Sequence, residues 1–558
     1  MIRIGFDVGG TFTDFVLHDP RAGAPRHFKL PTTPDDPSRA ISDGVAAILR
    51  DAGAVAADVS FVGHGTTIAT NMVIERKGAP LAQLVTKGFR DVLEIGRQTR
   101  PHLYDYAVRV PPPLVPREWR IEIAERLDAD GAVLVPLDEA AVARAAEALR
   151  AQGVGAVAIC FLHAYANDAH ECRAQAIVRA ALPGAFVCRS SGVLPEFREF
   201  ERFSTTAVNA AIGPRMAEYT ERLVDRLRGL GIGCDPLTIH SNGGLMRVET
   251  VRRFPGRTGR SAPGAGVVAA AAIAAAAGFP DAITFDAGGT STDVSLILGG
   301  RPAFATAREI AGYPVRMPMV DVHVVGAGGG SIAWLDDAGA PKVGPRSAGA
   351  DPGPAAYGRG GTEPTLTDAN IVLGRLDPAG LLRGRMRVDP ALAWRAIEER
   401  IARPLGIGVV EAALGIARIA VSNMSRAIRA VSTEKGHDPG AFALLAYGGA
   451  GPLHAAAVAE ECGMARALIP LEPGTLCARG ILMSDAGFDL SRGGIVAADE
   501  AGWKLVAARF AEMAAEGADW LAAEGIAPER RHCELSVDAR YRGQNHEVPV
   551  GLGIVASG

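Results

Sequence analysis

Residues 6–17 of this chain read FDVGGTFTDFVL, and residues 285–296 read FDAGGTSTDVSL. The two stretches share, in the same order, Phe, the first Asp, both glycines, both threonines, the second Asp and the final Leu. In each stretch small residues separate two apolar runs, which is typical of a β-hairpin. One copy alone would fit an ordinary glycine-rich hairpin. Two matched copies indicate a duplicated structural unit.

The residue types in this repeat favour a site for a phosphate chain. Glycine has no Cβ, so its backbone N–H groups can approach an anion closely. The threonines add hydroxyl donors, and Asp7 and Asp286 each end a strand, where a carboxylate can hold a hydrated cation. We therefore predict Asp7 and Asp286 as the catalytic and metal-holding residues. The predicted phosphate ligands are Gly9, Gly10, Thr11, Thr13, Asp14, Gly288, Gly289, Thr290, Thr292 and Asp293.

Composition limits the class of protein. The 558 residues suffice for about three or four domains. A formal charge of −4 gives no reason to expect nucleic acid or an anionic membrane as a partner. The seven cysteines form no CxxC pair, which argues against a disulfide framework or a structural zinc site. The chain opens directly on a strand pattern, and its most apolar run, residues 267–279, is too short to span a bilayer. We expect a soluble cytoplasmic protein without a signal peptide.

Strand patterns alternate with helix patterns along most of the chain, which predicts parallel sheets covered by helices. The predicted helices span about 37–52, 138–152, 170–181, 196–228, 263–278, 390–403 and 409–435. The predicted strands lie near 27–30, 60–62, 81–86, 121–127, 156–162, 237–240, 302–307, 320–325 and 442–447. Residues 343–367 are predicted to form a long loop over the cleft. From residue 491 onward we predict a helical hairpin and a closing strand pattern at 533–550.

Three further glycine-rich segments stand out. Residues 63–71, GHGTTIATN, predict a strand-to-helix turn, where α/β folds place ligands; a plain helix cap by Thr66 or Thr67 is the alternative. Residues 448–454, GGAGPLH, predict a similar turn suited to the phosphate or nucleoside end of a nucleotide, with Gly448, Gly449 and Gly451 as its ligands. Residues 326–331, GAGGGS, predict close backbone contact or a very sharp turn.

Other polar residues have structural explanations. The charge run at residues 196–202 is typical of a solvated helix face. Asp321 and His323 share one face of a strand, which favours a hydrogen-bonded pair over a metal site. His454, early in a helix, favours capping or packing over catalysis. For Asp368 and Asn370 a place in the cleft wall and a structural role both remain open.

The chain has no GxxxxGK[ST] motif, so a P-loop is excluded. Its duplicated hairpin with a distal Gly-Gly-Ala-Gly turn resembles the actin-like ATPase superfamily. With the segments 63–71, 326–331, 351–354 (DPGP) and 367–370 (TDAN), it resembles more narrowly the hydantoinase A/5-oxoprolinase family, from residue 1 to about 550. The resemblance implies an α/β, two-lobed actin-like (ribonuclease H-like) fold. The domains we expect are 1–200, 201–490 with the second hairpin, and 491–558, the start of a truncated C-terminal domain.

The resemblance also implies an activity. Family members use ATP and Mg²⁺ to phosphorylate the carbonyl or enol oxygen of a lactam, hydantoin or 5-oxoproline, and a hydantoinase B-type subunit completes the ring opening. We expect such a hydrolase here, in a hetero-oligomer. His64, Thr66, Thr67 and Asn71 are assigned to the substrate because they combine donors and acceptors on one turn.

Three alternatives to the hydrolase stay open: the ATP-using subunit of a ketone carboxylase, a non-catalytic reactivase or chaperone ATPase, and a small-molecule kinase. The 63–71 turn and the Tyr104–Tyr106 loop favour a small-molecule pocket over a reactivase. The chain departs from its relatives in two places, with Ala262-Pro263-Gly264 where they tend to have Gly-Pro-Ala, and Ala356 where many carry Cys.

Overall fold

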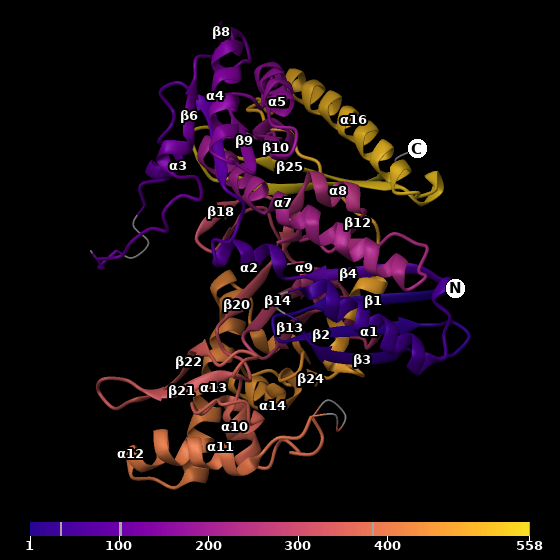
Figure 1. The fold of residues 1–558 in the computed structure, drawn as a ribbon, viewed down its shortest axis with the longest axis vertical. Coiled ribbons are helices and arrows are strands. Elements are labelled where there is room, and N and C mark those ends of the chain that lie inside the picture. The colour runs from indigo at the N-terminus through magenta and orange to yellow at the C-terminus, as the bar shows by residue number, and fades with distance from the viewer. Residues whose placement is uncertain are drawn as a thin grey trace.

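The computed structural model describes residues 1–33, 36–99, 103–105, 107–259, 261–381, 384 and 386–556. Tyr106 and the last two residues of the expected third domain lie outside the described residues. The fold is α/β and two-lobed, as predicted, and each lobe is built on a six-stranded sheet. Figure 1 shows the strands β1 to β4 of the first sheet at the middle of the molecule, with the helices α10 to α13 of the second lobe at one end.

The first sheet has the order β12-β11-β4-β1-β2-β3. Its strands are β1 (Ile2–Val8), β2 (Phe12–His18), β3 (Arg26–Pro31), β4 (Val59–Thr66), β11 (Leu237–Ile239) and β12 (Leu245–Met246). The second sheet has the order β15-β14-β13-β23-β24, and β20 (Val322–Val325) also pairs with β14. Its other strands are β13 (Ala282–Ala287), β14 (Thr292–Leu298), β15 (Arg301–Pro302), β23 (Ala443–Tyr447) and β24 (Ala467–Leu468).

The two sheets repeat one another in topology. In each, three antiparallel strands follow in chain order, and two later strands add in parallel to the first of them. The two copies of the repeat are therefore the β1–β2 and β13–β14 hairpins, as predicted. The first sheet takes β11 and β12 from beyond residue 200, so it draws on both of the first two expected domains.

Helix α1 (Pro37–Ala52) shows how local sequence sets an element that covers the first sheet. The Asp36 carboxylate accepts a hydrogen bond from the Ser38 N–H (3.1 Å), and Pro37 occupies the first helical position. Ile41, Val45 and Ile48 recur at helical spacing and are fully buried in the core of this lobe. Gly53, with a positive φ, ends the helix.

A third sheet, with the order β10-β9-β5-β6, is inserted between β4 and β11. Its strands are β5 (Leu81–Thr86), β6 (Arg120–Ile123), β9 (Ala156–Cys160) and β10 (Phe186–Arg189), and its helices are α4 (Glu139–Ala151) and α5 (Ala169–Ala181). All its pairings are parallel, as the alternation of strands and helices predicts. It stands at the end of the molecule opposite α10–α13 (Figure 1).

The 31-residue helix α7 (Glu199–Gly229) runs from this inserted sheet to the first sheet. The prediction that residues 196–202 form a solvated face is wrong. Arg202 is fully buried, and its guanidinium donates to the backbone O of Phe161 (2.8 Å) and of Glu196 (2.9 Å). Glu196 pairs with Arg316 (2.7 Å). These charges therefore hold the inserted sheet against the rest of the first lobe.

The remaining helices and strands complete the chain. The helices are α2 (Ile68–Ile74), α3 (Val92–Ile95), α6 (Ser190–Val193), α8 (Val248–Arg253), α9 (Ser261–Ala276), α10 (Leu366–Val372), α11 (Pro390–Ile397), α12 (Arg403–Leu405), α13 (Val409–Val431), α14 (Gly451–Glu461), α15 (Leu476–Met483) and α16 (Glu500–Ala523). The strands outside these three sheets are β7 (Arg126–Leu127), β8 (Val133–Val135), β16 (Phe304–Ala305), β17 (Arg308–Ile310), β18 (Tyr313–Val315), β19 (Met319–Val320), β21 (Ser331–Leu335), β22 (Pro341–Ser347), β25 (His532–Ala539) and β26 (Val548–Ala556).

Two of these elements correct the sequence analysis. The predicted helical hairpin after residue 491 is one helix, α16, whose Trp520 stacks on Phe488 at 5.1 Å between ring centroids. The predicted loop at 343–367 begins within strand β22. No single helix of the described residues is both long and apolar enough to cross a membrane, and one pair bent by 92°, Pro390–Leu405 and Val409–Lys435, meets that test only jointly.

Helices α9 and α15 join the two lobes through small residues. Helix α15 lies on β1, β4 and α9, and α9 also contacts β13 of the second sheet. A Cβ added at Gly480 of α15 would overlap the backbone O of Ala265 in α9. One added at Gly5 of β1 would overlap the backbone O of Ala478. The lobes therefore approach one another at backbone-to-backbone distance.

This packing gives a stability prediction. Gly480→Ala should lower the free energy of unfolding by about 1–3 kcal/mol, because overpacking at the α9–α15 contact outweighs the gain in helix propensity. Gly415→Ala is the matched control, since Gly415 lies in helix α13 with open space beside it. It should raise the free energy of unfolding by roughly 0.5–1 kcal/mol. Thermal unfolding of both variants measures the difference; equal effects would contradict the proposed contact.

Candidate functional site

The turns of the two hairpins meet between the lobes. A Cβ added at Gly289 would lie 3.3 Å from Oγ1 of Thr11, so the tips of the two turns are in van der Waals range. Within each hairpin the aspartates pair across the strands, Asp7 opposite Asp14 and Asp286 opposite Asp293. The structure thus brings together two segments that are far apart in sequence, with four carboxylates around the junction.

Burial and like charge raise the pKa values of the two leading aspartates. Removal from water, and then the Asp14 carboxylate, raise the pKa of Asp7 to about 7. Removal from water, and then Asp293, raise the pKa of Asp286 to about 8. Asp7 is 8% exposed, and its Oδ1 accepts no hydrogen bond within the described part of the chain. A buried carboxylate oxygen of this kind fits a cation that supplies the missing partner.

Glycines keep the space beside both carboxylates open. Gly65 ends β4 next to Asp7, and a Cβ added there would lie 3.0 Å from Oδ1 of Asp7. In the second lobe Tyr447 pairs opposite Asp286, and Gly448, the next residue, has a φ of +80°; a Cβ there would overlap Oδ1 of Asp286. In each lobe a glycine therefore lies next to the aspartate, where any side chain would crowd the carboxylate.

The glycine-rich segment 326–331 supports the second hairpin turn. The N–H of Gly329 donates to the O of Gly288 (3.0 Å), and the N–H of Gly330 donates to the O of Gly289 (2.6 Å). A Cβ added at Gly328 would lie 2.9 Å from three backbone atoms of the same turn. The predicted close backbone contact is confirmed, and the contact is with the turn around Gly288 and Gly289.

The predicted phosphate ligands divide into two groups. The Thr13 hydroxyl is buried and bonded to the Thr32 hydroxyl (3.0 Å), and the Thr292 hydroxyl is buried and donates to the O of Ala327 (2.5 Å). These two hydroxyls are directed into the protein. Thr11 and Thr290 are at the turns themselves and are partly or fully exposed, as are the turn glycines. The groups available to an anion are therefore the turn backbone and the hydroxyls of Thr11 and Thr290.

The predicted substrate residues do not share one surface. His64 lies within β4, is fully buried, stacks on Phe6 and contacts the Thr238 hydroxyl (3.1 Å). Burial lowers its pKa to about 3, so it is neutral. Thr66 is also fully buried, and its hydroxyl accepts from the N–H of Ile68, the capping role given as the alternative. Both side chains are buried because the strand extends further than the pattern predicted, and their assignment to the substrate stays a prediction.

The other two predicted substrate residues lie nearer the surface. The Thr67 hydroxyl donates to the O of Val8 (3.2 Å), which ties the start of α2 to the end of β1. Asn71 is exposed on α2. Tyr104, on the loop expected to form a small-molecule pocket, is 89% exposed.

The remaining predicted polar residues have structural partners. Asp321 pairs with Arg308 and Lys435. No group of three or more His, Cys, Asp and Glu side chains among the residues described is arranged to hold a metal. Asp368 accepts hydrogen bonds from Thr365, Ala355 and Ala356, within a capping box of α10. His454 is buried against the Asn370 side chain (3.3 Å), which agrees with the packing role predicted for it.

Sequence reasoning missed two residues of the site. Lys29 of β3 pairs with Asp14 (2.7 Å), and its alignment opposite Asp14 across the β2–β3 register was the signal that could have revealed it. The Cys477 thiol at the start of α15 donates to Oδ2 of Asp286 (3.5 Å). No local pattern marks Cys477, because it reaches the site only through the α15 packing between the lobes.

The comparisons with known proteins agree with this architecture. The family model described as hydantoinase/oxoprolinase matches residues 202–489, and the hydantoinase/oxoprolinase N-terminal region matches residues 3–182. The caprolactamase subunit alpha of Pseudomonas jessenii is 42% identical over 559 residues, covering 99% of this chain and 80% of that protein.

Two solved structures resemble the whole chain. The crystal structure of ATP-dependent caprolactamase from Pseudomonas jessenii superposes with a TM-score of 0.86 at 40% identity, covering 99% of this chain and 81% of that chain. The nucleotide-free structure of acetone carboxylase superposes with a TM-score of 0.81 at 27% identity and the same coverage.

The raised pKa values of Asp7 and Asp286 predict that the free energy of unfolding depends on pH when a chelator keeps the protein free of metal ions. The ordinary pKa of Asp is 3.8, so between about pH 4 and pH 8 the folded chain holds more protons on Asp7 and Asp286 than the unfolded chain. Their contribution to the free energy of unfolding therefore falls as pH rises through that window. Asp7→Asn and Asp286→Asn should flatten the fall and unfold at a higher temperature than the wild type at pH 8. Calorimetry from pH 5 to 8.5 measures the unfolding temperature of each variant, with Asp43→Asn, at an exposed aspartate, as control. If the site variants lose stability with pH as steeply as the wild type, the raised pKa values of Asp7 and Asp286 are refuted.

Proposed function

This chain belongs to the hydantoinase/oxoprolinase family, and from that premise we propose that it is the ATP-using subunit of an enzyme that opens a cyclic amide. The observation that carries the proposal is the meeting of two matched glycine-rich turns beside Asp7 and Asp286, in a chain 42% identical to a caprolactamase subunit alpha. The substrate class is a lactam, hydantoin or 5-oxoproline-like ring. The expected cofactors are ATP and Mg²⁺.

The residues present fit these cofactors. Mg²⁺ prefers oxygen ligands, keeps most of its waters, and needs only one or two carboxylates, which Asp7 and Asp286 supply from opposite lobes. The N–H groups of Gly9 and Gly288 close the two turns by donating to the O of Phe12 and of Ser291 (3.0 Å each), so the N–H groups of Gly10 and Gly289 are the ones we assign to phosphate oxygens, with Gly9 and Gly288 shaping the turns. We assign Gly448, Gly449 and Gly451, just before and at the start of α14, to the phosphate or nucleoside end of the nucleotide; the N-terminus of α14 favours a phosphate group there. The carboxylates of Asp14 and Asp293 add negative charge beside Asp7 and Asp286 and raise the pKa values of these two residues.

The chemistry explains why a phosphate site serves ring opening. An amide carbonyl is a poor electrophile, and Mg²⁺–ATP, when bound, supplies the phosphoryl group that turns its oxygen into a good leaving group. The protein's share is positioning and charge neutralisation, because phosphoryl transfer asks for little covalent chemistry from side chains. The two lobes contribute one turn each, and α9 and α15 pack between the sheets that carry these turns.

Ring opening itself is assigned to a partner. The relative's name, a subunit alpha, supports a multi-subunit enzyme, and a hydantoinase B-type subunit is the expected partner. The likeness to acetone carboxylase supports a second candidate, phosphorylation of a ketone enolate for carboxylation. We favour the cyclic amide because the caprolactamase is the more similar of the two in sequence and in structure.

An ATPase screen tests the proposal. ATP turnover by the chain together with its B-type subunit should rise with lactams, hydantoins or 5-oxoproline more than with ketones. A rise with ketones alone would move the assignment to carboxylation, and a rise only with a protein partner would move it to a reactivase. A stable phosphorylated product, detected by phosphorus NMR, would indicate a small-molecule kinase.

The catalytic assignment has its own test. Asp7→Ala and Asp286→Ala should each reduce ATP turnover by about a hundredfold or more, since each removes a charge that positions the transferred group. Asp43→Ala, an exposed aspartate on α1, is the control and should keep full turnover. Circular dichroism checks that all three variants remain folded. Retained turnover in either site variant would contradict the assignment.

A further inference from the structure

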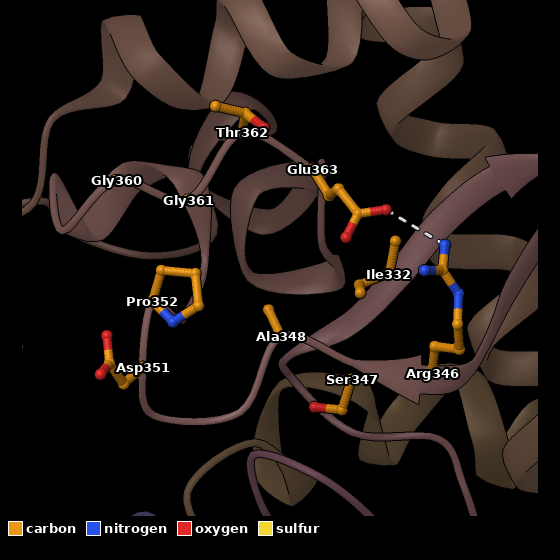
Figure 2. A pocket seen from close by; sticks show the side chains of 11 residues that line it. Ile332, Arg346, Ser347, Ala348, Asp351, Pro352, Gly360, Gly361, Thr362 and Glu363 are labelled. Atoms are coloured by element: carbon orange, nitrogen blue, oxygen red, sulfur yellow. Dashed lines mark hydrogen bonds and ion pairs between the residues drawn. The ribbon is translucent and has the colours of Figure 1, made fainter.

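A cavity of ≈ 520 Å³ opens in the second lobe beside the segment that supports the second hairpin. This is the size range of small-molecule sites. Figure 2 shows its lining side chains arranged around a common space, with Arg346 and Glu363 on one side and Pro352 on the other. Its lining residues are Ile332, Arg346, Ser347, Ala348, Asp351, Pro352, Gly353, Gly360, Gly361, Thr362 and Glu363.

Hydrogen bonds connect the wall of this cavity to the second hairpin turn. The N–H of Ala348 donates to the O of Gly330 (2.9 Å), and the N–H of Gly330 donates to the O of Gly289 (2.6 Å). A Cβ added at Gly330 would lie 2.9 Å from the Ser347 hydroxyl oxygen. One glycine therefore separates the cavity wall from a turn that we assign to the phosphates.

One side of the cavity carries a donor and an acceptor side by side. The Arg346 Nη2 donates to Oε1 of Glu363 at 3.1 Å, and the two side chains are 60% and 43% exposed. A guanidinium has five N–H donors and a carboxylate about four acceptor positions, so one hydrogen bond leaves both groups with unused capacity. Their accessible edges can therefore serve a ligand that needs both a donor and an acceptor.

The rest of the lining is partly apolar. In Figure 2 the Ile332 side chain lies next to the Arg346–Glu363 bond, while the Ala348 methyl and the Pro352 ring face the same space. Gly360 and Gly361 add no side chain. The cavity thus combines one paired polar edge with a surface for methylene groups.

We propose that this cavity binds the cyclic amide, with Arg346 donating to its carbonyl oxygen and Glu363 accepting from its N–H. A lactam ring holds its amide in the cis form, so C=O and N–H point outward along one edge, matching an adjacent donor and acceptor. The ring methylenes contact Ile332, Ala348 and Pro352. This inference rests on the proposed function, and it replaces His64 and Thr66, which the fold buries, as the substrate-recognising residues.

The test compares ligands that differ in one group. Five-, six- and seven-membered lactams, each with the lactone of the same ring size, are titrated into the full chain without nucleotide, and binding is measured by calorimetry. A lactone keeps the carbonyl and lacks the N–H. The chain should bind at least one lactam about tenfold more tightly than its lactone, the size expected for a hydrogen bond to a charged acceptor.

Two variants then separate the roles. Glu363→Ala should remove the preference for lactam over lactone, and Arg346→Ala should weaken binding of both about tenfold or more. Glu398→Ala is the matched control, because Glu398 pairs with Arg403 (3.6 Å) at similar exposure on the same lobe and lines no part of this cavity. It should leave both dissociation constants unchanged. All three side chains are partly exposed, so unchanged unfolding temperatures confirm that the fold is intact.

The outcomes distinguish this inference from the proposed function. Suppose that lactams stimulate ATP turnover, and that Glu363→Ala and Arg346→Ala leave the lactam KM and dissociation constant unchanged. This result overturns the cavity assignment and leaves the proposed function standing. If the chain binds no lactam and no lactam stimulates its ATP turnover, both the cavity assignment and the proposed function are overturned. Loss of the lactam preference in Glu363→Ala, with a raised lactam KM and little change in kcat, supports the assignment, because a merely structural role would lower the unfolding temperature and would weaken lactam and lactone binding alike.

Discussion

Crowding of negative charge between the lobes is the constraint on which this structure depends. Four aspartates from two hairpins surround one junction, and burial together with mutual repulsion raises the pKa values of the two leading ones. Lys29 pairs with Asp14, and its charge opposes part of the rise in the pKa of Asp7. Such an arrangement is costly for an isolated protein and becomes favourable when a cation is shared between the lobes. Under the proposed function, a Mg²⁺ ion shared by Asp7 and Asp286 would offset this charge.

The two lobes meet through contacts between backbones. Gly65 and Gly448, one in each lobe, let the end of a neighbouring strand approach each carboxylate, and Gly328 to Gly330 hold the second turn through backbone contacts. Helices α9 and α15 meet through Gly480 and Ala265 in the same way. Because close-packed backbone contacts have little freedom to adjust, small changes at the α9–α15 contact should be felt at the turns. We therefore expect substitutions at the α9–α15 contact to affect the geometry of the two turns.

The features that could be predicted from the sequence are those that depend on local patterns of residues. The hairpins, α1 with its Asp36 cap, and the alternation that gives the inserted parallel sheet all follow from periodicity and turn residues. Where the pattern was misread, tertiary contacts decided the result. His64 and Thr66 continue a central strand and are buried by helices far away in sequence, and Arg202 is buried because backbone carbonyls across the domain accept its hydrogen bonds. Cys477 and Lys29 enter the site only once the sheet register and the α15 packing are known.

The position of the inserted sheet has a consequence for biosynthesis. Strand β11 completes the first sheet by pairing with β4, yet residues 67–236, including the whole inserted sheet, lie between them in the chain. All of these residues must be synthesised before the β4–β11 pairing can form. Long-range strand pairing of this kind is slow and leaves an intermediate prone to association. The inserted sheet thus sets the order of assembly of the N-terminal lobe, and chaperones that shield strand edges would act at this stage.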